Sequence, residues 1–312
     1  MILPHPVQYQ GSKRNLAQVI LRYFPKKVNR IVEPFAGTAA ISIAAAAKQI
    51  SQRFWMNDIN SPLIKLLELI IEHPEEIADF YSELWNEQHN DSVEHYCQVR
   101  EQFNRTQEPK FFLYLLARCA KGSVRYNAEG LFNQSPDKRR KGTRPETMKK
   151  NIFGVSFLLK GKCIFSDMDY KEVLQSVDHD DLVYMDPPYQ GVCGERDSRY
   201  YAGITFDDFV NALEELNKRK IAFIVSYDGR RGEKSFGNPL PDFLNLTKIE
   251  IEAGRSSQAT LLGREEITVE SLYLSSALSG KCNKKRSACF YPKYKTEQIP
   301  LTETYEKQSA FV

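Results

Sequence analysis

The run DPPY (residues 186–189) combines an acid, two prolines and an aromatic side chain directly after a short apolar segment. Proline has no backbone N–H, so the two prolines offer only carbonyl acceptors, to which an ionised Asp186 adds its carboxylate oxygens. The run is therefore suited to hold a group with two N–H donors, such as an exocyclic –NH2. Hydrogen bonds from both hydrogens would localise the nitrogen lone pair for attack on a methyl carbon, and Asp186 would stabilise the positive charge that develops. Tyr189 offers a flat face for a ring, worth roughly 1–3 kcal/mol if that ring is a base. A rigid proline turn after a strand is the alternative.

The run EPFAGT (residues 33–38) could bind a ligand at the end of a strand. It follows a β-branched segment and precedes an alanine-rich one, and in open α/β sheets ligands bind beyond the carboxyl ends of the strands. Ala36 and Gly37 would let a ligand approach the backbone closely, and the helix start after them offers unpaired N–H groups. Asp58 ends the next expected strand, 21 residues after Gly37, where a carboxylate can hold two ribose hydroxyls. Because no GxGxxG pyrophosphate cradle is present, the pattern favours a ribose-bearing ligand without a pyrophosphate, with S-adenosylmethionine as the obvious candidate. A plain strand–turn–helix is the alternative.

The elements that would position these two runs alternate along the chain. A strand over 28–33, a helix over 39–48, a strand over 53–57 and a helix over 63–71 start a doubly wound α/β sheet. The alternation stops over roughly 74–160, where helices are expected at 75–87, 93–103, 109–121 and 143–159, with a basic loop or hairpin at 122–141. It resumes with strands over 163–165, 182–185 and 221–226, a helix over 206–219, and an antiparallel pair over 246–251 and 267–274. The segment without strands is interpreted as an inserted second domain.

Charge is segregated along the chain although the net charge is only +3 (43 − 40). Residues 68–101 carry ten acids against one arginine, residues 121–150 carry nine basic residues against three acids, and residues 281–307 carry seven against three. This pattern predicts one positive face, as in a protein that binds a polyanion such as nucleic acid. Chance clustering on a solvated surface is the alternative. Near the end of the basic loop, Lys138, Arg139 and Arg140 suit phosphate contacts, which position a protein on DNA without reading its sequence.

The ordered set of motifs resembles that of the Dam-like class of DNA adenine-N6 methyltransferases over nearly all of residues 7–276. The run QYQGSK (8–13) resembles the family's N-terminal cofactor segment, EPFAGT its glycine-containing cofactor loop, and NDIN (57–60) its ribose-binding strand end. DPPY is the family's catalytic tetrapeptide unchanged, and RYN (125–127) with Gly130 and FN (132–133) resembles its target-recognition domain. The resemblance implies methyl transfer from S-adenosylmethionine to adenine N6 in double-stranded DNA after base flipping.

The resemblance also implies a role for each matched residue. The expected catalytic residues are Asp186, Pro187, Pro188 and Tyr189. The expected S-adenosylmethionine-binding residues are Tyr9, Gly11, Lys13, Glu33, Phe35, Ala36, Gly37, Thr38, Asp58, Asp167, Met168 and Asp186. The expected DNA-binding residues are Arg125, Tyr126, Asn127, Asn133, Lys138, Arg139 and Arg140. After Asn133 the chain has QSP where the family commonly has Val-Pro, so the bases that are read stay open.

The fold class expected from both arguments is α/β: a doubly wound Rossmann-like methyltransferase sheet with an antiparallel last strand, plus an inserted, mainly helical target-recognition domain. Residues 1–70 and 161–278 would form the catalytic domain. Residues 71–160 would form the target-recognition domain, and residues 279–312 a basic C-terminal tail.

Composition and missing motifs disfavour other classes. No run of 18 apolar residues exists for a membrane-spanning helix and no signal peptide is visible. The resemblance implies a cytoplasmic, nucleoid-associated protein that a prokaryote or phage encodes. The six cysteines include no CxxC pair and are expected to be free thiols, and without HExxH or a Cys/His cluster no metal is expected. No Pro-Cys pair is present for methylation of cytosine C5. Cytosine N4 in DNA, an RNA amino group and a non-catalytic DNA-binding scaffold remain alternatives, and a companion restriction endonuclease is left open.

Overall fold

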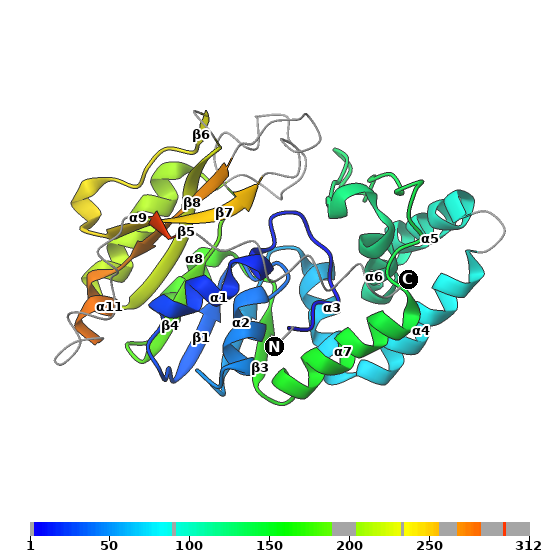
Figure 1. Cartoon of the computed structure of the whole chain (residues 1–312), viewed down its shortest axis with the longest axis horizontal. Coiled ribbons are helices and arrows are strands. Elements are labelled where there is room, and N and C mark those ends of the chain that lie inside the picture. Colours follow the sequence, from blue (N-terminus) through cyan, green and yellow to red (C-terminus); the bar gives the residue numbers. More distant parts are fainter. Residues whose placement is uncertain are drawn as a thin grey trace.

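Strands from both halves of the chain form one sheet (Figure 1). The computed structural model describes residues 3–88, 92–188, 204–231, 234–255, 267–281 and 296–297. Its strands are β1 (Arg30–Glu33), β2 (Phe54–Asn57), β3 (Cys163–Ser166), β4 (Asp181–Met185), β5 (Ala222–Arg231), β6 (Lys234–Phe236), β7 (Thr247–Arg255), β8 (Ile267–Leu274) and β9 (Thr296–Glu297). They lie in the order β3-β2-β1-β4-β5-β8-β7-β9, and β6 pairs with β5. Strands β1 to β5 run parallel, whereas β8 is antiparallel to β5 and β7, which confirms the expected sheet with its antiparallel last strand.

The parallel strands form where the sequence is apolar on both faces. In β2 (FWMN) and β4 (DLVYM) every residue is buried, as expected for strands covered by helices on both sides. Along β4, Leu182 and Tyr184 pack into one hydrophobic core, while Val183 and Met185 pack into the other. The strand order reverses between β1 and β4, so the segments that follow these two strands diverge and leave a crevice at the carboxyl edge of the sheet.

Helices form both cores. The α-helices are α1 (Ala17–Ile20), α2 (Ala40–Ala47), α3 (Ser61–Glu72), α4 (Pro74–Glu87), α5 (Ser92–Thr106), α6 (Pro109–Arg118), α7 (Pro145–Leu159), α8 (Tyr170–Gln175), α9 (Phe206–Lys218) and α11 (Ser276–Lys281). Helices α1 to α7 contribute to one core and α8 and α9 to the other. Helix α2 (AISIAAAA) is buried over nearly its whole length, because its small side chains let it lie close to the sheet.

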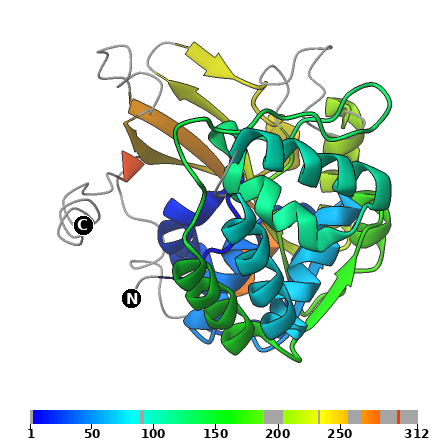
Figure 2. The same cartoon turned by 90° about the vertical axis from the view of Figure 1, so that its right-hand side faces the viewer.

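The middle of the chain is helical, as the sequence predicts. Proline stands in the first turn of α3, α4, α6 and α7, where its missing N–H breaks no helical hydrogen bond. Figure 2 shows these cyan-to-green helices as a group in front of the sheet. Helix α7 packs against α2 and α3 as well as α4, and all of them share one core. The division at residues 71 and 160 therefore stays a prediction.

Several elements differ from the sequence-based expectation. Helix α6 ends at Arg118 rather than residue 121, because Cys119 adopts an extended backbone and pairs with Pro136. Strand β5 continues past Ser226 to Arg231 through an irregularity in its pairing with β8. Helices α1, α8 and α11 and strands β6 and β9 were not expected. Among the described residues, no helix is long and apolar enough to cross a membrane.

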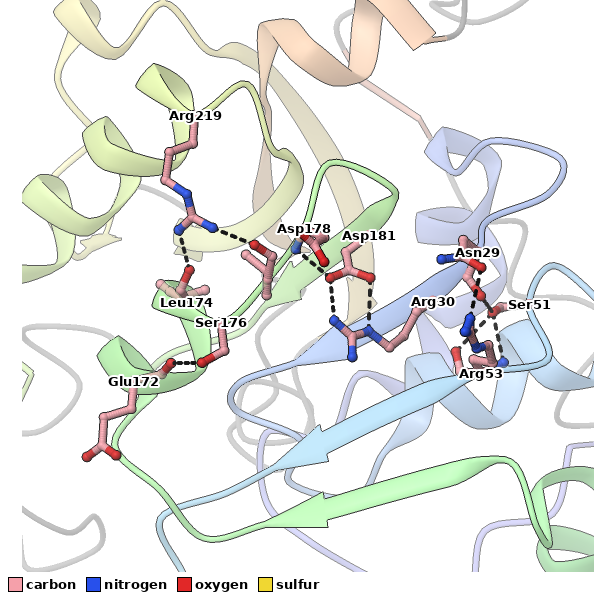
Figure 3. A network of polar contacts seen from close by, with 11 residues as sticks. Asn29, Arg30, Ser51, Arg53, Glu172, Leu174, Ser176, Asp178, Asp181 and Arg219 are labelled. Atoms are coloured by element: carbon pink, nitrogen blue, oxygen red, sulfur yellow. Dashed lines mark hydrogen bonds and ion pairs between the residues drawn. The ribbon is translucent and has the colours of Figure 1, made fainter.

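A polar network ties together the amino ends of the strands, opposite the crevice (Figure 3). Arg30 of β1 donates from Nε and Nη2 to the two carboxylate oxygens of Asp181 in β4, at 2.9 and 2.6 Å. Arg219, just after α9, donates to the carbonyl oxygens of Leu174 and Val177. Such two-pronged arginine contacts hold groups in a defined orientation, so this end of the sheet is fixed without contributing to the crevice.

Candidate active site

A cavity of about 560 Å³ lies at the carboxyl edge of the sheet. The structure brings to its wall most of the residues expected at the cofactor and the catalytic centre. Those that line it are Tyr9, Gly11, Lys13, Glu33, Phe35, Ala36, Gly37, Thr38, Asp58, Met168, Asp186, Pro187 and Pro188. Tyr189 lies outside the described residues. Asp167 is exposed and is not among the lining residues, whereas Asp169, which caps α8 by accepting from the Lys171 N–H at 2.8 Å, does line the cavity.

The turn after β1 is tied to the end of β2. The Ala36 N–H donates to the Asn57 carbonyl at 2.8 Å, and the Gly37 N–H donates to Asp58 Oδ2 at 2.9 Å. Gly37 has a φ of +51°, which glycine adopts at little cost. The second carboxylate oxygen of Asp58 accepts from the Asn60 N–H at 3.0 Å. Burial raises the pKa of Asp58, and the two backbone hydrogen bonds oppose that rise.

Asn57 begins the NDIN motif, but sequence reasoning assigned it no role of its own, and it is not among the residues that line the cavity. Its side chain is buried, donates to the carbonyl oxygens of Pro34 and Met168 at 3.0 Å each, and accepts from the Ser166 hydroxyl at 2.7 Å. One amide therefore fixes the segments that follow β1, β2 and β3 relative to one another. The available signal was a polar residue at the last position of an otherwise apolar strand, FWMN.

Glu33 lines the cavity with 2% of its surface exposed. Its Oε1 accepts from the Ser42 N–H at 2.8 Å. Burial raises the pKa of the Glu33 carboxyl to about 7; the hydrogen bonding from Ser42 opposes this rise, and the nearby Asp186 adds to it. Glu33 therefore titrates near neutral pH, in contact with the space where a ligand would lie.

The segment after β4 forms a charged corner of the cavity. Lys13 Nζ lies 2.9 Å from Asp186 Oδ1 and 3.3 Å from Glu270 Oε2. Lys13 is 8% exposed, against 20% for Asp186 and 21% for Glu270. Pro187 is buried beside Asp186 and Pro188 is half-buried. The structure thus joins the QYQGSK and DPPY motifs through one ion pair, and it adds Glu270, which the sequence did not indicate.

The loop between α6 and α7 carries the predicted DNA-binding residues. Arg125, Asn133, Lys138, Arg139 and Arg140 are all exposed on it. Its backbone pairs Tyr126 with Phe132, and the Asn133 N–H donates to the Arg125 carbonyl at 3.0 Å. These contacts place the Arg125 and Asn133 positions side by side on the surface.

Two of the residues predicted to bind DNA have structural contacts within the protein. Asn127 Oδ1 accepts from the backbone N–H groups of Glu129 and Leu131, at 3.0 and 2.8 Å. Tyr126 is buried, lines the cavity and donates from its hydroxyl to Asn60 Oδ1 at 3.2 Å. The loop therefore touches the same strand end that carries Asp58.

Residues 3–12, which we call the strap, run between the cavity and this loop. The Gln10 N–H donates to the Gly122 carbonyl at 2.9 Å, and the Ser123 hydroxyl donates to the Gln10 side chain. Gln8 Nε2 donates to Thr143 Oγ1 at 3.0 Å. Tyr9 and Gly11 of the strap line the cavity. The cavity wall and the loop between α6 and α7 are thus hydrogen-bonded to one another at several points.

A family model for D12 class N6 adenine-specific DNA methyltransferases matches residues 9–253, well over half of the chain. The chain belongs to this family. This D12-class protein is 31% identical over 187 residues to the DNA adenine methylase of Escherichia coli (strain K12), over 59% of this chain and 64% of the relative. It is 27% identical over 205 residues to the DNA adenine methylase of Haemophilus influenzae, over 64% and 68% of the two chains.

A phage protein is also similar to the D12-class chain. The DNA N-6-adenine-methyltransferase of Escherichia phage P1 is 25% identical over 232 residues, which are 71% of this chain and 29% of the phage protein. The predicted resemblance is confirmed, and the protein is an adenine-specific DNA methyltransferase that requires a methyl donor and acts on DNA.

Proposed function

We propose that this D12-class enzyme transfers a methyl group from S-adenosylmethionine to N6 of an adenine within a specific sequence of double-stranded DNA, after that base has left the helix. The observation that carries the proposal is the position of Asp186 and its two prolines on the wall of the cavity that Asp58, Gly37 and Glu33 also line. Bacterial and phage relatives support a place for the enzyme beside DNA in the cytoplasm. The family description favours adenine over cytosine N4 or an RNA amino group as the acceptor.

The cavity suits S-adenosylmethionine in space and in charge. A Cβ added at Gly11 or Gly37 would meet no protein atom within 4 Å, so both glycines leave open the space that a ligand needs. Asp58 would hold the ribose hydroxyls, and Glu33 would face a cationic part of the ligand. Tyr9, Phe35 and Met168 supply apolar walls. When bound, S-adenosylmethionine supplies an electrophilic methyl carbon and leaves as a neutral thioether.

The catalytic corner acts on the acceptor amine. One N–H of the adenine –NH2 would donate to the Asp186 carboxylate and the other to a carbonyl oxygen of the proline backbone. These two contacts would take the N6 lone pair out of conjugation with the ring and leave it free to form the N–C bond, with the electron pair of the broken C–S bond going to sulfur. Asp186 stabilises the positive charge on nitrogen before one N–H proton passes to solvent. The base would leave the helix at a cost of a few kcal/mol, offset in part by contacts in the cavity.

Mapping of the product tests the proposal. Purified protein, S-adenosylmethionine and plasmid DNA are incubated, and modified bases are located by single-molecule sequencing. N6-methyladenine at one short sequence, absent without the donor, is the expected result. Methylation found only on cytosine, or only on RNA added to the same reaction, contradicts the proposed function.

The affinity for S-adenosylmethionine is expected to rise between pH 6 and pH 8. A cation binds ionised Glu33 better than protonated Glu33. At a pH where Glu33 is protonated in the free enzyme, binding therefore releases the Glu33 proton. With the pKa of Glu33 raised to about 7, the dissociation constant should fall by up to about tenfold over this range. Titration calorimetry at pH 6, 7 and 8 measures it. Glu33→Gln should flatten the pH dependence of the dissociation constant. Glu215→Gln, a substitution of an exposed residue on α9, should retain it. A pH dependence that survives in Glu33→Gln would assign it to another group.

Removal of positive charge from the loop should weaken DNA binding irrespective of sequence. Lys138 and Arg139 are exposed near the end of the loop, where they suit phosphate contacts. Lys138→Ala and Arg139→Ala should each lower affinity by a similar factor for all sequences and reduce the salt slope by about one. Fluorescence anisotropy at several salt concentrations measures both quantities, with Lys218→Ala on α9, 62% exposed, as the control. Loss confined to one sequence would indicate a base contact instead.

A further inference from the structure

Strand β8 brings a second carboxylate to the catalytic corner. Glu270 lines the cavity, and its Oε2 lies 3.3 Å from Lys13 Nζ, which also lies 2.9 Å from Asp186 Oδ1. The Lys13 ammonium is the most buried of the three charged groups. One cation therefore joins two carboxylates, one that follows β4 and one within β8.

The position of Glu270 is fixed by how β8 pairs with β5. Ser226 pairs with Leu272 and Gly229 with Glu270, with a shift of register between the two pairs. A Cβ on Gly229 would lie 2.7 Å from the Val269 carbonyl oxygen, so glycine permits the close approach of the strands at this point. The Ser226 hydroxyl donates a hydrogen bond to Glu270 Oε2 at 3.4 Å. Two features of β5 thus hold Glu270 where Lys13 can reach it.

The charges at the corner determine what Asp186 can do. Asp186 must stabilise positive charge on the acceptor nitrogen, and an ammonium paired with Asp186 alone would offset the charge that does so. With Glu270 present, the three groups together carry a net charge of −1. Glu33, at the end of β1, is a further acid close to Asp186.

We infer that Glu270 is a positioning residue for methyl transfer: it holds the Lys13 ammonium between the two carboxylates and so preserves the negative charge that Asp186 presents to the acceptor amine. The inference rests on the proposed function, because that function gives Asp186 its role. Glu270 acts through Lys13 and does not itself contact the reacting atoms.

Single-turnover kinetics test the inference. Glu270→Gln should lower the rate constant for methyl transfer by about tenfold or more, with the dissociation constants for DNA and S-adenosylmethionine within about threefold of wild type. Glu270→Asp, which keeps the charge on a shorter side chain, should lose less. Glu252→Gln, on β7 and outside the cavity wall, is the matched control and should retain the wild-type rate. A wild-type rate in Glu270→Gln overturns the inference.

A double-mutant cycle separates action through Lys13 from a general loss of structure. In a Lys13→Met background, Glu270→Gln should change the rate less than about twofold, because the cation it positions is gone. A full additional loss in that background means that Glu270 acts by another route and overturns the inference.

A spectroscopic readout makes the result independent of activity. Nitrogen NMR of the Lys13 ammonium should show a lower lysine pKa in Glu270→Gln and an unchanged one in Glu252→Gln, because one of the carboxylates that favours the charged amine is lost. An unchanged Lys13 titration in Glu270→Gln overturns the inference even in an active enzyme. Absence of methyl transfer by wild-type protein would instead defeat the proposed function, and the lysine titration would still report on the Glu270 contact.

Discussion

Asp186→Asn is expected to lower the rate of methyl transfer by about 10²- to 10³-fold, because a charged group aimed at developing positive charge is replaced by a neutral one of the same shape. DNA affinity should stay within a few fold of wild type, since the exposed basic residues predicted to bind DNA lie on the loop between α6 and α7 and not at Asp186. Single-turnover transfer of a labelled methyl group measures the first quantity, and fluorescence anisotropy the second.

Asp180→Asn is a matched control for this prediction. Asp180 directly precedes β4 and is exposed, whereas Asp186 directly follows the same strand and lines the cavity. The two substitutions make the same chemical change at opposite ends of one strand. Near wild-type transfer by Asp186→Asn, or an equal loss in Asp180→Asn, would contradict the mechanism.

Arg118→Met is expected to destabilise the protein by about 3–5 kcal/mol, because it removes three hydrogen bonds from a charged donor, each of which contributes about 1.5–3 kcal/mol at most. The guanidinium of Arg118 is 1% exposed and donates to the carbonyl oxygens of Ser92 at 3.0 Å, Asp137 at 2.9 Å and Arg140. Without it, three part-buried hydrogen bonds to backbone carbonyl groups are lost. The turn that carries Lys138 and Arg139 is then released from α6, so DNA affinity should fall with stability.

Urea denaturation and DNA anisotropy measure the two effects of Arg118→Met. Arg105→Met is the control, because Arg105 is exposed on α5 and hydrogen-bonds only to the nearby Gln102 among the contacts described for it. Stability within about 1 kcal/mol of wild type in Arg118→Met, as for an ordinary surface substitution, would mean that the guanidinium does not anchor the loop.

Much of the sheet and of the cavity could be predicted from sequence because both depend on short, local patterns. Apolar runs such as FWMN and DLVYM are long enough to mark buried strands. The chemistry-bearing residues follow those strands directly, and parallel strands end at one edge of a sheet. Glu33, Asp58 and Asp186 were therefore expected to lie close together, and all three line one cavity in the structure.

The residues that escaped prediction owe their roles to contacts between distant segments. Glu270 looks like an ordinary polar position in a strand, ITVESLYL, until the order β5-β8-β7 places it beside Lys13. Arg118 looks like a surface arginine at the end of an amphipathic helix, and only the returning loop buries it. Gly142 permits that return: its φ is +83°, and a Cβ there would lie 3.1 Å from Arg118 Cδ. No local pattern encodes such contacts.

The strap has a practical consequence for redesign. The proposed function makes the loop between α6 and α7 the segment to exchange for a new target site, but this loop is held at Gly122, Ser123 and Thr143 by Gln8 and Gln10. A grafted loop without hydrogen-bond partners for Gln8 and Gln10 would leave the strap unanchored. The strap also forms part of the cavity wall, at Tyr9 and Gly11. Chimaeras should therefore exchange residues 8–10 together with the loop, so that the cavity proposed to bind the methyl donor keeps its wall.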